Sequence, residues 1–169
     1  MKVRYLIGLV VSSICALHAE AQCHSHPELH FFNSIIGDLE IKISEAPKPM
    51  ENLRGILVSP GEAELINVKL DPKIYVPELK DFRSLTEEEL NSVAFKLPSI
   101  VLVGESGEPV THYSTNNKYF TVRELLQAVD VTELKTRGNT EWLGGIDIHH
   151  VFFEGIHCEY GQWQIYWGS

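Results

Sequence analysis

The densest group of side chains that could carry chemistry lies between Asp147 and Glu159. Neutral imidazole and carboxylate groups are the ligands that zinc and copper accept in proteins. If this segment is one regular strand, alternate side chains point to opposite faces, so Asp147 and His149 share one face while His150 and Glu154 share the other. We therefore consider Asp147, His149, His150 and Glu154 as candidate ligands for zinc or copper.

The same segment also has a plain structural interpretation. Val151 and Phe153 fall on the face of His149, so this histidine has the neighbours of a core strand. His157 lies eight residues beyond His149, a separation of about 26 Å along an extended strand at about 3.3 Å per residue. The two histidines therefore cannot share one metal ion on a straight strand, and no complete ligand set stands on one face.

A second candidate is the polar stretch between residues 136 and 145, which is expected to join a helix to a strand. It contains Arg137, Asn139, Glu141 and Trp142, together with a pair of glycines. Charge, an amphipathic ring and a mobile backbone are typical of binding loops. We predict these four residues as a ligand-binding loop, with the alternative that Trp142 folds back onto the core.

The N-terminal residues resemble an export signal in composition and order. Lys2 and Arg4 precede an apolar run from 5 to 17, and Ala19-Glu20-Ala21 follows. This arrangement predicts a signal peptide over residues 1–21 with cleavage after Ala21. An apolar run this short falls below the roughly 20 residues of a membrane-spanning helix. We expect a secreted or periplasmic protein with no stable membrane anchor after cleavage.

Removing 21 of the 169 residues leaves 148, which is the size of one domain. We predict a single exported globular domain over residues 22–169, with Cys23 and Cys158 as its two cysteines. In an oxidising compartment these cysteines predict one disulfide, the alternative being two free thiols. The exposed N-terminus would also carry Cys23, His24, His26 and His30, a second group able to bind copper, or simply solvated histidines.

The charge of the chain argues against one class of partner. The formal net charge is −9, and no run of Lys and Arg is present. An anionic surface repels the phosphate backbone, so we expect no nucleic-acid binding. The apolar content of 44% and charged content of 22% are those of an ordinary globular protein.

The elements that must position these residues follow from periodicity and from turn residues. Helices are predicted over 27–36, 87–95 and 121–135, the last from a capping box formed by Thr121 and Glu124. Strands are predicted over 39–43, 55–58, 65–70, 99–103, 109–114, 146–158 and 163–167, and residues 71–81 with their two prolines are expected to be irregular.

This pattern predicts a small α+β domain with a mostly antiparallel sheet and two or three helices. Its C-terminal half has the order strand, strand, helix, strand, strand. No hydrolase elbow, phosphate-binding loop or zinc ribbon is present. We therefore expect a non-catalytic binding or interaction domain without a cofactor, which binds a protein or a small molecule. The alternative is a metal-binding protein or metal-dependent hydrolase that uses Asp147, His149 and His150.

Overall fold

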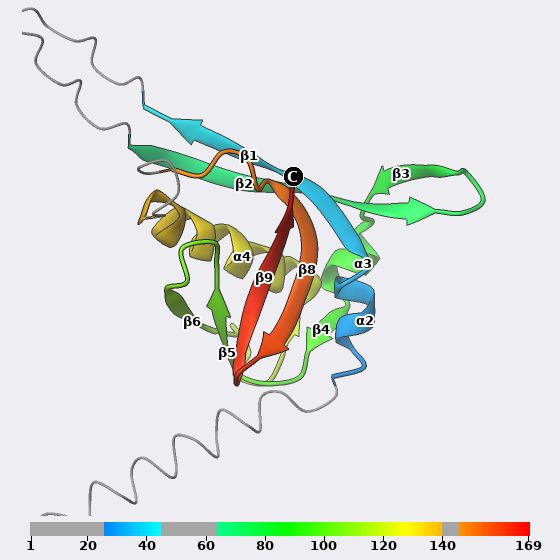
Figure 1. The fold of residues 1–169 in the computed structure, drawn as a ribbon. Coiled ribbons are helices and arrows are strands. Elements are labelled where there is room, and N and C mark those ends of the chain that lie inside the picture. Colours follow the sequence, from blue (N-terminus) through cyan, green and yellow to red (C-terminus); the bar gives the residue numbers. More distant parts are fainter. Residues whose placement is uncertain (1–25, 45–63, 140–145) are drawn as a thin grey trace, which may run out of the picture.

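The computed structural model describes residues 26–44, 64–139 and 146–169. Within these residues a seven-stranded sheet has the order β3-β2-β1-β8-β9-β5-β6 and curls around the helix α4 (Figure 1). The strands are β1 (Ile35–Ile43), β2 (Leu65–Val76), β3 (Asp81–Ser84), β5 (Ser99–Val103), β6 (Pro109–Tyr113), β8 (Phe152–Glu159) and β9 (Gln162–Gly168). The pairs are antiparallel except β5 with β9, so a mixed α+β fold with a mostly antiparallel sheet is confirmed.

The remaining elements are short, except for α4. The helices are α2 (Leu29–Phe32), α3 (Glu87–Asn91) and α4 (Val122–Thr136), followed by the 3-10 helix η1 (Arg137–Asn139). A second, two-stranded sheet joins β4 (Val93–Phe95) to β7 (Phe120–Thr121). The order predicted for the C-terminal half, two strands, a helix and two strands, is present with β7 added before the helix.

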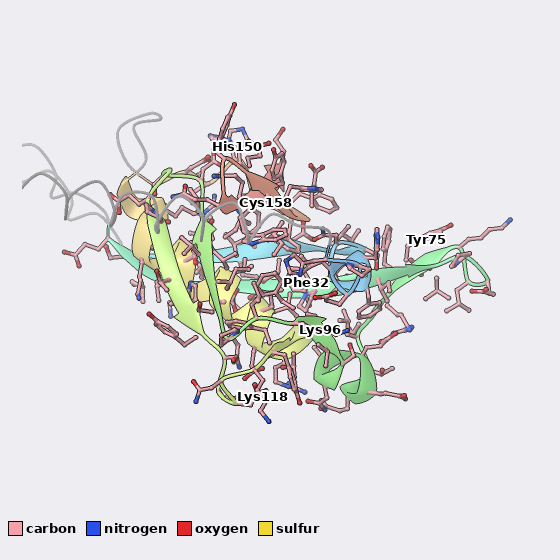
Figure 2. The ribbon with its side chains drawn as sticks, turned by 90° about the horizontal axis from the view of Figure 1, so that it is seen from below. Phe32, Tyr75, Lys96, Lys118, His150 and Cys158 are labelled. Atoms are coloured by element: carbon pink, nitrogen blue, oxygen red, sulfur yellow. The ribbon has the colours of Figure 1, made fainter. Side chains whose placement is uncertain are left out.

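Helix α4 forms where the capping box predicts it. The Thr121 hydroxyl accepts a hydrogen bond from Glu124 N–H, and the Glu124 carboxylate accepts one from Thr121 N–H. These bonds satisfy two donors that the first turn of a helix leaves unpaired. Val122, Leu125 and Val129 are completely buried and form the apolar stripe that fills the concave face of the sheet. Figure 2 shows Phe32 inside this core and Tyr75 on the β2–β3 hairpin, away from it.

The helix predicted over 27–36 is wrong at its C-terminal end. Helix α2 ends at Phe32, and β1 already begins at Ile35. Gly37 does not stop a helix but lies inside β1, where a Cβ atom would collide with the carbonyl oxygen of Asp71 on β2. The glycine is therefore required for the close approach of two strands.

The prediction that residues 71–81 are irregular is also wrong. Strand β2 continues to Val76 through Pro72, which pairs with Gly37. The N–H of Leu70, two residues earlier, points away from β1, so the nitrogen of Pro72 does the same. The missing N–H costs no ladder bond there, because β3 pairs with β2 only from Lys73 onward.

Two further predicted elements change at one end. The helix expected over 87–95 stops at Asn91, and residues 93–95 pair with β7, which buries Ala94 and Phe95. The strand expected over 146–158 begins only at Phe152. In the described part of the chain, no helix combines the length and apolar character that crossing a membrane requires.

Several predictions fall on residues that the structure does not describe. These are the signal peptide over 1–21, the strand over 55–58, and the residues Cys23, His24, Glu141 and Trp142. Cys158 lies in β8 opposite Trp163 on β9. Since Cys23 lies outside the described residues, the disulfide between Cys23 and Cys158 stays a prediction.

Candidate metal-binding site

The segment before β8 is a turn built around Asp147. One carboxylate oxygen of Asp147 accepts hydrogen bonds from the backbone N–H groups of His149 (2.7 Å) and His150 (3.3 Å). Short carboxylate side chains often fold back onto the following backbone in this way and compete with strand pairing. The strand alternation expected for residues 147–150 is therefore absent, and the imidazole of His150 lies against the Asp147 carboxylate.

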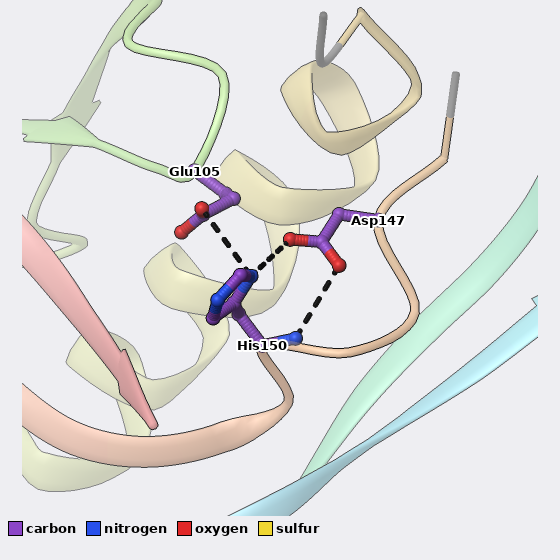
Figure 3. Close-up of side chains that lie close together, drawn as sticks. All are labelled: Glu105, Asp147 and His150. Atoms are coloured by element: carbon purple, nitrogen blue, oxygen red, sulfur yellow. Dashed lines mark hydrogen bonds and ion pairs between the residues drawn. The ribbon is translucent and has the colours of Figure 1, made fainter. Parts of the chain in front are cut away.

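Three potential metal ligands converge at this turn (Figure 3). The imidazole Nδ1 of His150 is 2.6 Å from Oδ2 of Asp147 and 3.7 Å from Oε1 of Glu105. Glu105 comes from the turn between β5 and β6, far from the other two in sequence. One ligand atom from each of the three residues lies within 4.8 Å of the other two.

The trio of Glu105, Asp147 and His150 is buried at one side and open at the other. Asp147 is 2% exposed, whereas the His150 side chain is 31% exposed. Burial opposes the ionisation of Asp147, but hydrogen bonds from His149 and His150 outweigh it and lower the pKa of this carboxyl. The hydrogen bond to Asp147 raises the pKa of His150, and the nearby charges of Asp147 and Glu105 add to that effect.

This arrangement offers ligand atoms that suit either a proton or a metal ion. Nδ1 of His150 faces both carboxylates, so a proton on this nitrogen is attracted by both. A divalent cation that replaced this proton would contact one imidazole nitrogen and two carboxylate oxygens, a mixed N/O ligand set that zinc accepts. Three protein ligands would leave at least one position of a tetrahedral ion for water or another ligand.

A buried ion pair holds the turn that carries Asp147 and His150. Nε of Arg137 donates to Oε2 of Glu133 at 2.6 Å, and both side chains are completely buried at the end of α4. Nη1 of the same Arg137 donates to the carbonyl oxygens of Asp147 (3.0 Å) and His150 (2.8 Å). The guanidinium carbon lies 4.9 Å from the ring centre of Trp167, at cation–π distance.

The same ion pair also holds the turn that carries Glu105. The Glu133 carboxylate accepts hydrogen bonds from Nε1 of Trp167 (3.0 Å) and from the backbone N–H of Glu105. Burial raises the pKa of Glu133 despite the opposing effects of Arg137 and these donors. Both segments of the trio are thus fastened to Glu133 and Arg137, which fixes the spacing of the three ligand atoms.

The other predicted site residues are placed differently. His149 is exposed and takes part in the turn through its backbone, and Glu154 lies on the exposed face of β8, outside the trio. Of the predicted binding loop, Arg137 is completely buried in the ion pair and Asn139 ends η1, while Glu141 and Trp142 lie outside the described residues. A ligand-binding loop over 136–145 stays a prediction.

The N-terminal histidines that the structure describes do not share a helical face. His26 precedes α2 and packs against the rings of Phe95 (4.7 Å) and Trp163 (5.7 Å), while His30 is exposed on the helix. Nδ1 of His26 lies 3.1 Å from the Glu28 carboxylate. His26 thus occupies a structural position in the aromatic core.

Sequence reasoning missed Glu105 and Glu133, and it placed Arg137 in a binding loop rather than in a buried ion pair. Glu133 and Arg137 are four apart on a predicted helix, and this spacing of opposite charges is a recognisable signal for a side-chain pair. Glu105 has no such local signal, because only the pairing of β5 with β9 brings its turn to Asp147. Comparison of this chain with protein-family models, curated proteins and solved structures found no match.

Proposed function

We propose that this chain is an exported, non-catalytic binding domain whose ligand is a divalent metal ion, with zinc as the first candidate, held by Glu105, Asp147 and His150. One observation carries the proposal: three ligand atoms from two distant segments lie within 4.8 Å of one another. The buried pair of Glu133 and Arg137 supports it, because the pair fixes both segments before any ligand arrives. Export rests on the predicted signal peptide over residues 1–21.

Zinc binding to the mature protein tests the proposal. Residues 22–169 are stripped with a chelator, titrated with zinc by calorimetry, and analysed for metal after dialysis. We expect one zinc ion per chain, and at least tenfold weaker binding in H150A and in E105Q. H149A is the matched control, because His149 is an exposed neighbour that lies outside the trio. Absence of stoichiometric zinc, or equal losses in H149A and H150A, would contradict the proposal.

Bound metal is also expected to stabilise the fold. A ligand that binds only the folded state at 100 times its dissociation constant adds about 2.7 kcal/mol of stability. Urea unfolding with and without zinc measures this gain. The gain should be the same in the wild type and in H149A, and smaller in H150A by about 1 kcal/mol or more at the same zinc concentration.

A further inference from the structure

The outer face of α4 is left uncovered beside the edge of β2. A groove of about 470 Å³ lies between the two elements, lined chiefly by Asn67, Val68 and Lys69 of β2 and by Asp130, Val131 and Leu134 of α4. Figure 1 shows β2 running alongside α4, with β6 at another side of the helix. A second groove of about 170 Å³ lies between α4 and β6 and meets the first at Gln127 and Val131.

The edge of β2 beside this groove has backbone groups that pair with no strand of the described residues. Among the described residues, no strand pairs with β2 on the side away from β1 before Lys73. The Leu70 N–H points to that side and donates to Oδ1 of Asp130 at 2.8 Å. Val68 is two residues earlier, so its N–H and C=O point the same way. An open strand edge of this kind is a template for an added strand.

Two apolar side chains lie on the wall opposite this edge, beside Gln127 and Asp130 of the same helix. Val131 and Leu134 are each 39% exposed on α4. Ile66 of β2, two residues before Val68, is 51% exposed. An extended peptide lying along β2 could therefore place alternate side chains against α4 while its backbone pairs with Val68.

A carboxylate stands at one end of the groove. Among the described residues, Leu70 N–H is the one hydrogen-bond donor to Asp130, and Lys69 is the one charge that acts on it. Burial raises the pKa of Asp130 to about 6, so a nearby cation would stabilise its charged form. The chain as a whole carries a net charge of −9, which favours a basic ligand over a second copy of the chain.

We propose that this groove binds an extended segment of a partner protein, which adds as a strand to β2 at Val68, packs against Val131 and Leu134, and places a Lys or Arg side chain beside Asp130. The groove shares no residue with Glu105, Asp147 and His150. Peptide binding is therefore independent of metal binding and is tested in the presence of a chelator.

Amide NMR spectra of the mature protein test the proposal with synthetic peptides. The probe is a capped seven-residue peptide in which threonine alternates with valine and a lysine replaces the central valine, so that the lysine and the two remaining valines share one face. We expect saturable shifts of the Val68 and Lys69 amides and protection of the Val68 amide from hydrogen exchange. A peptide with prolines in place of two valines lacks the backbone donors and should not bind.

Protein variants separate this surface from other exposed apolar positions. V131K should weaken binding of the lysine peptide at least tenfold. L79K is the matched control, because Leu79 is 67% exposed at the tip of the β2–β3 hairpin, outside the groove. D130N should weaken binding of the lysine peptide several-fold while leaving a peptide with glutamine at that position unaffected.

Three results would overturn the proposal. The first is no binding of the lysine peptide, and the second is an equal effect of V131K and L79K. The third is protection of the Val68 amide that rises with protein concentration in the absence of peptide, which would identify a second copy of the chain as the occupant.

Discussion

The Asp147 carboxylate organises its turn with three hydrogen bonds, two from backbone N–H groups and one from His150. In D147N the amide carries no negative charge, so the pKa of His150 should fall from its raised value toward that of an ordinary histidine. NMR titration of the imidazole measures this change. D38N, a substitution of an exposed aspartate on β1, should leave the pKa of His150 where it is in the wild type.

The hydrogen-bonded pair of Asp147 and His150 also predicts how the stability of the fold depends on pH. The raised pKa of His150 contributes stability that is fully present below about pH 6.5, the pKa of histidine in the unfolded chain. This contribution is lost as the pH rises through the pKa of His150 in the folded protein. The lowered pKa of Asp147 contributes stability that is fully present above about pH 3.9, the pKa of aspartate in the unfolded chain. This contribution is lost as the pH falls through the pKa of Asp147 in the folded protein. The difference in unfolding free energy between wild type and D147N should therefore shrink above neutral pH. A constant difference from pH 5.5 to 8.5 would contradict this assignment.

Arg137 joins α4 to the turn at Asp147, and its removal should be costly. R137L leaves the Glu133 carboxylate buried without its countercharge, and such losses destabilise proteins by about 3 to 5 kcal/mol. Urea unfolding at pH 7 measures the loss. R83L is the matched control, since Arg83 makes a 2.7 Å ion pair with Glu89 but is 38% exposed; exposed pairs contribute about 1 kcal/mol or less. Similar losses in the two variants would contradict the structural role given to Arg137.

At the scale of elements, the junction between β5 and α4 depends on a glycine. A Cβ at Gly104 would collide with Oε1 of Glu133. Glu133 cannot move away freely, because Arg137 and Trp167 hold its carboxylate. G104A should therefore destabilise the fold by about 1 to 3 kcal/mol, the usual cost of overpacking, and should weaken zinc binding by displacing Glu105.

The control for this substitution lies on the same side of the molecule. Gly138 follows Arg137 in η1, and a Cβ there would meet nothing within 4 Å. G138A should unfold at nearly the same urea concentration as the wild type. If G104A is as stable as G138A, the Glu133 carboxylate is not fixed as the structure indicates.

Elements specified by local signals were predicted well from the sequence. Helix α4 begins at its capping box, and β5 and β6 flank the turn at Gly107 as expected. Prediction failed where pairing with a distant strand decides the outcome. Pro72 is accepted inside β2 because its nitrogen faces away from β1, and Gly37 is required by the approach of β2. Neither fact follows from residues near them in the sequence.

The residues of the candidate site were likewise predicted where they are close in sequence and missed where a distant strand brings them together. Asp147 and His150 were predicted as ligands because they are close in sequence, although the turn that joins them was taken for a strand. The third residue, Glu105, is about forty positions away and reaches them only through the order β8-β9-β5 in the sheet. A single sequence carries no signal for that order.

At the scale of the whole molecule, α4 packs in the concave face of the curled sheet. His112 of β6, a titratable side chain, lies against this helix. Nε2 of His112 lies 2.8 Å from the Thr132 hydroxyl of α4. Burial lowers the pKa of His112 to about 4, with a smaller contribution from Lys135. This histidine is therefore neutral in the folded protein down to a pH at which the unfolded chain already binds a proton.

Acid should consequently destabilise the whole fold through His112. Because its folded pKa is below the unfolded value of about 6.5, its contribution is complete above that pH and is lost as pH falls toward 4. The loss at pH 4 is on the order of 3 kcal/mol. H112Q replaces the imidazole with a neutral amide, so it should lose less stability than the wild type between pH 7.5 and 4.5 in urea unfolding. H30Q, on the exposed side of α2, should follow the wild type. Equal acid sensitivity of H112Q and H30Q would assign the destabilisation to groups other than His112.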